Sequence, residues 1–228
     1  MNPIGIYFAF WEREWQGDYL AYVRKVKRLG FDILELGAGA LPDMTAAERR
    51  AVADAAREEG VRLTYCIGLP PQYDVSSPDE SVRLAGVRYV STLLDCIGEM
   101  GGGILGGIVY ACWPAAEMSI DRKAVMREKA LLSVRELAKR AEDRGVTYCL
   151  EIVNRFEQCL LNTAEEGRAF VDEVGHPAVK LLLDSFHMNI EEDSMVDAIL
   201  EAGPWLGHFH VGENNRRPAG STNRLPWK

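Results

Sequence analysis

Three side chains of the kinds that bind metal ions stand at the downstream ends of apolar, strand-like runs. Glu151 lies in Tyr-Cys-Leu-Glu-Ile-Val, Asp184 ends Leu-Leu-Leu-Asp, and His210 lies in Gly-His-Phe-His-Val-Gly. The spacings, 33 residues from 151 to 184 and 26 from 184 to 210, are each typical of one strand-plus-helix unit. Neighbouring parallel strands would therefore bring two carboxylates and an imidazole to one rim. Such oxygen and nitrogen ligands suit a hard to borderline divalent cation.

Each of these residues also has a plainer interpretation. Glu151 could be a buried carboxylate that pairs with an arginine or a backbone amide. Asp184 could be the N-cap of the following helix. His208 and His210 share one face of their strand, so one of them could be a hydrogen-bonded core histidine. We choose His210 because it lies nearer the catalytic end, and the shared strand-end position of all three favours function.

Other candidates follow the same strands. Glu157 alone would be a solvated loop charge, His187 could hydrogen bond to a surface loop, and Arg216 could lie on the surface. Tyr7 and Trp113 stand at strand exits, where aromatic residues usually belong to the core. A flat ring in an exit loop, with a few polar groups around it, would nevertheless suit the face of a sugar.

These residues can meet only if a parallel sheet positions them, and the pattern of apolar runs predicts such a sheet. Most of the runs are apolar on both faces, as strands covered by helices must be. The seven runs are 4–10, 32–36, 61–67, 104–110, 146–153, 179–184 and 206–211. Alternation with helices indicates an α/β fold. We favour a closed barrel over an open doubly wound sheet, because no Gly-x-Gly-x-x-Gly follows the first run.

Helix boundaries support this pattern. Thr45-Ala-Ala-Glu48 and Thr163-Ala-Glu-Glu166 have the form of capping boxes, and Ser77-Pro-Asp-Glu80 places a proline at a predicted first helical turn. Glycines precede most of the strand runs, where helix C-caps are expected. The acidic run 191–193 is interpreted as a solvated turn and helix start. No linker interrupts the alternation, so we expect one domain over residues 1–228.

The composition excludes several classes of protein. With 228 residues and 47% hydrophobic content, the chain can form a substantial core. A net charge of −8 argues against a nucleic-acid groove, including that of a DNA-repair endonuclease. The chain has no long apolar run and no signal peptide at the start, and its five cysteines have no Cys-x-x-Cys pair. We therefore expect reduced thiols and a cytoplasmic location.

Several motifs together resemble the D-tagatose 3-epimerase family, which includes the D-psicose (allulose) 3-epimerases. The longest are Leu-Glu-Ile-Val-Asn-Arg-Phe-Glu at 150–157 and Leu-Asp-Ser-Phe-His-Met-Asn-Ile-Glu-Glu at 183–192. Gly-Ile-Tyr-Phe-Ala-Phe-Trp at 5–11, Trp-Pro at 113–114 and Gly-His-Phe-His-Val-Gly-Glu at 207–213 add to them. The resemblance runs along the whole chain.

The resemblance implies a xylose isomerase-like TIM barrel that interconverts free ketohexoses, such as fructose and psicose or tagatose and sorbose. The reaction would remove the C3 proton and pass through an enediolate. A divalent metal is implied, Mn²⁺ or Co²⁺ with Mg²⁺ as an alternative, as are homodimers or homotetramers. By motif position, the metal ligands would be Glu151, Asp184 and His210. The residues that hold the O1–O3 end of the sugar would be Glu157, His187 and Arg216. The sugar pocket would be lined by Tyr7, Cys66 and Trp113. Glu151 would also be catalytic.

The printed sequence departs from the family at its end. The family has a fourth ligand, a second glutamate, on an eighth strand, and the sequence stops before such a segment. We therefore expect a (β/α)8 barrel with about seven βα units, C-terminally incomplete, with unpaired edges on the first and seventh strands. With three ligands and one base, weak metal binding and little epimerisation are expected. The turn at 218–224 also differs from the family's glycine-rich form.

Two alternatives remain open. One is a related barrel enzyme of the hydroxypyruvate or inosose type, acting as an isomerase or dehydratase. The other is a degenerate, non-catalytic barrel that binds a sugar but lacks the second glutamate.

Overall fold

Seven parallel strands lie side by side in the order in which the chain makes them. The computed structural model describes residues 2–115, 120–222 and 225. The strands are β1 (Gly5–Tyr7), β2 (Ile33–Gly37), β3 (Arg62–Cys66), β4 (Gly103–Gly106), β5 (Val146–Ile152), β6 (Val179–Asp184) and β7 (Leu206–His210). This order is that of a TIM barrel, because a doubly wound sheet would reverse its order at a switch point. The predicted fold class is confirmed.

The sheet is strongly curled. Glu35 on β2 and His208 on β7 are far apart in strand order, yet Glu35 Oε2 lies 2.8 Å from His208 Nε2. Strands β1 and β7 are the two edges of the sheet within the described residues. No eighth strand occurs in the described residues that follow His210.

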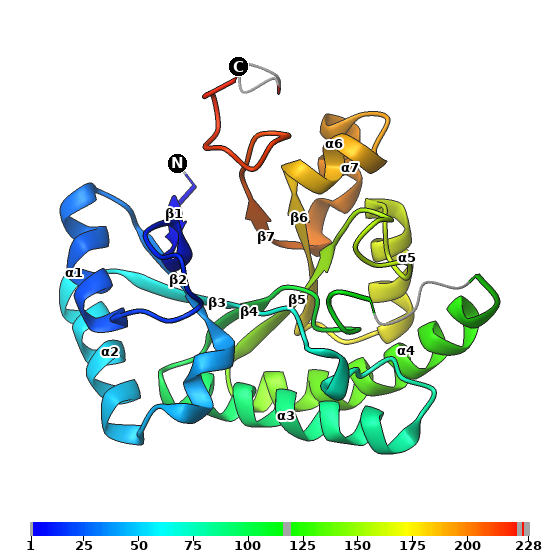
Figure 1. Cartoon of the computed structure of the whole chain (residues 1–228), viewed down its shortest axis with the longest axis horizontal. Helices are drawn as coiled ribbons and strands as arrows, with labels where there is room; N and C mark the ends of the chain where they lie inside the picture. The colour runs from blue at the N-terminus through cyan, green and yellow to red at the C-terminus, as the bar shows by residue number, and fades with distance from the viewer. Residues whose placement is uncertain (1, 116–119, 223–224, 226–228) are drawn as a thin grey trace.

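Helices form an arc around the outside of this sheet (Figure 1). They are α1 (Tyr19–Leu29), α2 (Ala46–Glu59), α3 (Glu80–Glu99), α4 (Ile120–Asp143), α5 (Ala164–Val174), α6 (Ser185–Glu191) and α7 (Met195–Ala202). Four 3-10 turns also occur: η1 (Phe8–Phe10), η2 (Ala38–Asp43), η3 (Pro71–Tyr73) and η4 (Gly203–Trp205). Most strand side chains in β5 and β6 are buried, as a sheet covered on both faces requires.

The helix boundaries follow from the sequence with two exceptions. Thr45 and Glu48 form the complete capping box at α2, and Gly30 adopts the left-handed conformation at the end of α1. At α5 the box is only half made: Thr163 accepts from Glu166 N–H, but the Glu166 carboxylate accepts from Asn162 instead. Asp79 is the N-cap of α3, so the proline at 78 lies just outside that helix.

Two predicted strands are shorter than expected. The run 104–110 ends as a strand at Gly106, because Gly107 has φ +112° and a Cβ there would lie 2.1 Å from Ile67 O. The run 4–10 ends at Tyr7, and the chain turns into η1. Beyond these strands Phe8, Val109 and Tyr110 are buried, whereas Phe10 is exposed.

Two further expectations concern the chain as a whole. None of the five cysteines forms a disulfide within the described part of the chain. Among the described residues, no helix combines the length and the apolar character that a membrane crossing requires.

Candidate active site

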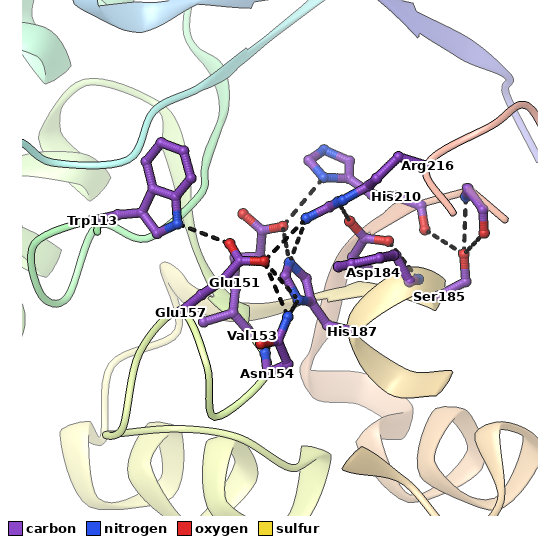
Figure 2. Close-up of polar contacts among 12 residues, drawn as sticks. Trp113, Glu151, Val153, Asn154, Glu157, Asp184, Ser185, His187, His210 and Arg216 are labelled. Carbon is purple, nitrogen blue, oxygen red and sulfur yellow. Dashed lines mark hydrogen bonds and ion pairs between the residues drawn. The ribbon is translucent and has the colours of Figure 1, made fainter. Parts of the chain in front are cut away.

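The three strand-end residues predicted as metal ligands lie together in the structure. Asp184 and His210 end the neighbouring strands β6 and β7 and are partners in the strand register, and Glu151 is the last residue but one of β5. Glu151 Oε1 lies 3.6 Å from His210 Nδ1. Figure 2 shows these side chains converging at one rim of the sheet. Parallel pairing and the predicted spacing therefore bring them together, while their role as ligands stays a prediction.

The atoms that could hold a cation fall into two groups among the described residues. Glu151, Asp184 and His187 form one group, and Glu35, Cys66 and His210 form the other; in each, the candidate ligand atoms lie within 4.8 Å of one another. His210 touches both groups, since its Nδ1 faces Glu151 and its Nε2 lies 2.9 Å from Glu35 Oε1. The donor sets are oxygen and nitrogen in the first group and include a thiol in the second, so the first suits Mn²⁺, Co²⁺ or Mg²⁺ better.

Arg216 supplies the positive charge beside these carboxylates. Its Nη1 donates to Asp184 Oδ2 at 2.8 Å, and Nη2 lies 3.5 Å from Glu157 Oε1. The guanidinium stacks on the Phe186 ring, with 3.7 Å between its central carbon and the ring centroid. Arg216 also adopts φ +63°, a strained value for a residue with a side chain. The loop after β7 therefore holds the arginine in the site, although half of its side chain is exposed.

His187 is the central imidazole of the site. It lies on α6, three residues after Asp184, which is the N-cap of that helix. Nδ1 accepts from the Asn154 backbone N–H at 3.1 Å, so in the neutral ring Nε2 carries the proton. Burial lowers the pKa of His187, which overrides the opposite effect of the Glu151 and Asp184 carboxylates. His187 is therefore neutral, and its Nε2 lies 3.9 Å from Glu151 Oε1 and 3.2 Å from Arg216 Nη2. Because a guanidinium only donates, a protonated Nε2 makes no hydrogen bond to Arg216 and its N–H is left for another acceptor.

Glu151 is buried but ionised. Burial alone would raise the pKa of Glu151, yet the contact with His210 and the positive charges of His210 and Arg216 lower it below its usual value. Burial likewise lowers the pKa of His210, but Glu35 and Glu151 on either side outweigh burial and raise it. The lowered pKa means that Glu151 is ionised at neutral pH, so its oxygens carry no proton and are free to accept one.

Trp113 and Glu157 form the outer wall of the site. The Trp113 Nε1–H donates to Glu157 Oε2 at 2.8 Å, and Asn154 Nδ2 donates to Glu157 Oε1 at 3.1 Å. Trp113 is 38% exposed, and its indole covers Gly68, where a Cβ would lie 2.9 Å from the ring. An exposed ring whose N–H is tied to a carboxylate can offer a flat face to a ligand in the site.

Tyr7 and Cys66 lie at the side of the site occupied by Glu35. Burial raises the pKa of the Tyr7 hydroxyl, and the neighbouring Cys66 and Glu35 raise it further. Burial also raises the pKa of the Cys66 thiol well above its usual value, again with Glu35 as the next cause. Both groups are therefore neutral, and the predicted pocket lining is close to the strand-end carboxylates.

Sequence analysis missed two residues of the site. Glu35 lies in the apolar run Ile-Leu-Glu-Leu and carries the same signal as Glu151, a charge inside a strand. Asn154 holds both His187 and Glu157, and no pattern in the sequence singles it out. The acidic run 191–193 was also misinterpreted as solvated: the Glu191 side chain is 1% exposed and pairs with Arg155 at 2.6 Å.

Comparison with known proteins identifies relatives of the whole chain. The model of the xylose isomerase-like TIM barrel family matches residues 23–227. The D-psicose 3-epimerase of Ruminiclostridium cellulolyticum is 45% identical over 224 residues, 98% of this chain and 76% of that protein. The L-ribulose 3-epimerase of Methylomonas sp. is 33% identical over 92% of this chain and 73% of that protein. A crystal structure of D-psicose 3-epimerase with D-tagatose from Clostridium cellulolyticum H10 superposes with a TM-score of 0.95 at 44% identity, covering 99% of this chain and 78% of that one.

Proposed function

Because the chain belongs to the xylose isomerase-like TIM barrel family and, within it, to the ketose 3-epimerases, we propose that it epimerises free ketoses at C3 with the help of a divalent cation. Relatives named D-psicose and L-ribulose 3-epimerases support this substrate class. The observation that carries the proposal is Glu151, an ionised and buried carboxylate at the rim. Around it stand His187, His210 and Arg216, so a base and several donors face one small volume.

The chemistry explains why such a base is needed. The C3–H bond of a ketose lies next to the C2 carbonyl, and breaking it leaves an enediolate whose negative charge must be stabilised. In this proposal Glu151 accepts the C3 proton as a general base. His187 Nε2–H and the Arg216 guanidinium are placed to donate to sugar oxygens as charge develops on them. Glu157 and Trp113 would hold the sugar in place.

A divalent cation fits the residues at the strand ends. Glu151 and Asp184 supply carboxylate oxygens, and His187 and His210 are the two imidazoles in reach of Glu151. We propose Glu151, Asp184 and His210 as ligands, with His187 left to contact substrate, because its Nδ1 is already committed to Asn154. When bound, the cation would act as a Lewis acid that polarises the sugar's carbonyl. Mn²⁺ or Co²⁺ is the proposed ion.

Inversion at C3 also needs a proton delivered from the opposite face of the sugar. The family resemblance assigns this second role to a glutamate outside the motifs of the printed sequence. Exchange of the C3 hydrogen with solvent requires only the step assigned to Glu151, so it isolates this half of the reaction.

A substrate panel tests the proposed activity. The chain is incubated with Mn²⁺ and, separately, with D-fructose, D-tagatose, L-ribulose, hydroxypyruvate and an inosose, and the products are separated by chromatography. We expect conversion or C3 exchange only with the ketoses, and loss of both in Glu151→Gln. Turnover of hydroxypyruvate or the inosose alone would favour the related isomerases or dehydratases. Ketose binding without any exchange would favour a sugar-binding barrel.

We further propose a cytoplasmic homodimer or homotetramer that forms a single barrel domain. The five thiols, none of which forms a disulfide in the described chain, are compatible with a reducing compartment. Sedimentation equilibrium measures the assembly directly, and a monomer across micromolar concentrations would contradict this part of the proposal.

A further inference from the structure

Glu35 is a buried carboxylate that stands opposite both histidines of β7. It is 5% exposed, and an ionised carboxylate at such a depth is costly unless cations or hydrogen-bond donors face it. His208 Nε2 lies 2.8 Å from Glu35 Oε2, and His210 Nε2 lies 2.9 Å from Oε1. The two oxygens of one side chain therefore serve two imidazoles that are two residues apart on the same face of β7.

The carboxylate is itself held in position. Glu35 Oε2 also accepts a hydrogen bond from Thr64 Oγ1 at 3.0 Å, and Glu35 and Thr64 are partners in the register of β2 and β3. Glu35 therefore contacts β3 on one side and β7 on the other, and its Oε1 is directed at His210. The 2.9 Å approach of His210 Nε2 to Glu35 Oε1 is an ion-pair contact, and His210 Nε2 has no hydrogen bond of ordinary geometry among the described residues.

The contact decides which nitrogen of His210 is available to a cation. An ionised carboxylate only accepts, so the nitrogen facing Glu35 must carry a proton. A histidine that binds a cation must be neutral. In the neutral ring Nδ1 is then the nitrogen that offers a lone pair, and Nδ1 is the atom that faces Glu151, at 3.6 Å. Metal-ligating histidines generally donate their second N–H to a carboxylate or carbonyl, which fixes the ring and strengthens the ligand.

We propose that Glu35 is a positioning residue, which orients His210 so that Nδ1 faces the cation site between Glu151 and Asp184. This inference rests on the proposed metal dependence. Glu35 acts through His210 and does not itself contact the substrate. This role also explains why a charged residue, Glu35, stands inside the apolar strand β2 on the far side of the curled sheet.

Asp74 supplies a matched control. It is as buried as Glu35, at 6% exposure, and accepts hydrogen bonds from Ser76 N, Ser76 Oγ and Cys112 N. These contacts lie in the loops after β3 and β4, and none of them involves His210. Asp74→Asn therefore removes a buried charge of the same kind without changing the partner of His210.

The first experiment measures Mn²⁺ binding from the electron paramagnetic resonance signal of the free ion. Glu35→Gln and Glu35→Ala should weaken binding about 10–100-fold, whereas Asp74→Asn should stay within about twofold of the unsubstituted chain. Melting of the metal-free proteins reports structural damage separately. Mn²⁺ binding that Glu35→Ala leaves unchanged would overturn this inference alone. Failure of the unsubstituted chain to bind Mn²⁺ would overturn both the inference and the proposed metal site.

The second experiment needs no variant at Glu35. Nuclear magnetic resonance of the Mg²⁺-loaded chain with ¹⁵N-labelled histidine distinguishes protonated, free and metal-bound ring nitrogens. Substitution of the other three histidines in turn assigns the His210 signals. We expect a protonated Nε2 and an unprotonated Nδ1 whose shift changes when Mg²⁺ is added. A protonated Nδ1 in the loaded chain would overturn the inference, even if the Glu35 variants fail to fold.

Discussion

At the scale of single residues, the site consists of carboxylates that face cations or donors. Glu151 lies beside His187 and His210, and Asp184 beside Arg216. Burial of a charged carboxylate costs free energy, and the contacts with these neighbours offset that cost. This balance keeps Glu151 ionised near neutral pH in a place from which water is largely excluded, so the carboxylate is unprotonated when a substrate arrives.

The Trp113–Glu157 hydrogen bond gives a prediction about substrate binding. Trp113→Phe keeps an aromatic ring but removes the donor to Glu157 Oε2. A net hydrogen bond contributes about 0.5–1.5 kcal/mol, so KM for a ketose should rise roughly 2–10-fold with little change in kcat. Trp205→Phe, in η4 at the other end of β7, is the control and should leave both constants unaltered. A loss confined to kcat would show that Trp113 acts in the chemical step instead.

Some of the site was predictable from single residues, and some was not. Glu151 and Asp184 were predictable because charges at the ends of apolar strands have few structural uses. Glu35 carries the same signal, but its nearer partner, His208, is 173 residues away on the far side of a curled sheet. Pairwise contacts across the barrel depend on the curvature of the sheet, which no local pattern in the sequence specifies. Asn154 contacts His187 through its backbone N–H, a group that every residue other than proline has, and contacts Glu157 through its side-chain amide.

At the scale of elements, strand order and helix caps were predictable, and strand ends were less so. The apolar run continues past the strand at β4 because the loop that follows is buried as well. Val109 and Tyr110, for example, are fully buried although β4 ends at Gly106. Residues 107–110 are apolar because they are buried, whereas the backbone conformation at Gly107 determines where strand β4 ends.

Gly107 provides a test of this interpretation. Its φ is +112°, a Cβ would lie 2.1 Å from Ile67 O, and its carbonyl accepts from Glu151 N–H at 3.0 Å. Gly107→Ala should lower the free energy of unfolding by more than about 2 kcal/mol, because the backbone must move. Gly30→Ala, at φ +84° with no atom within 4 Å of the added Cβ, should lose only about 1 kcal/mol. Equal losses in urea denaturation would refute the steric explanation.

The first turn of α3 gives a prediction about pH. Hydrogen bonding from Arg83 lowers the pKa of Glu80 from 4.5 to about 2, and Arg83 is itself buried. A lowered pKa means that the stabilisation is present above pH 4.5 and is lost as the pH falls through about 2. Glu80→Gln should therefore lower Tm at pH 7, and the difference from the unsubstituted chain should shrink towards pH 2.

Asp54→Asn is the control for this experiment. Asp54 pairs with Arg57 on the exposed face of α2, and such surface pairs contribute little. Its Tm should match that of the unsubstituted chain at both pH values. A Glu80→Gln deficit that stays constant down to pH 2 would contradict the linkage argument.

At the scale of the whole molecule, the curled sheet brings distant segments around one centre. Residues of β2, β3, β5, β6 and β7 contribute to the two groups of candidate ligands. A cation bound there would tie these strands together and would bind only the folded chain. Metal binding should therefore appear as global stabilisation.

Thermal unfolding measures this effect. At a Mn²⁺ concentration 100 times its Kd, the stabilisation is about 2.7 kcal/mol. For a domain of this size, that corresponds to a rise in Tm of roughly 5–10 °C, which excess chelator should reverse. Asp184→Asn removes a proposed ligand and should abolish the rise. An equal rise in that variant would place the bound ion elsewhere on the molecule.

Hydrogen exchange at C3 of a ketose tests the central claim most directly. The chain is incubated with D-fructose and Mn²⁺ in D₂O, and the H3 signal is followed by nuclear magnetic resonance. If Glu151 removes the C3 proton, deuterium should enter at C3 and at no other carbon, and Glu151→Gln should reduce the rate by about 10²–10⁴-fold. Intact H3 with bound metal and sugar, or the same exchange rate in Glu151→Gln, would contradict the account.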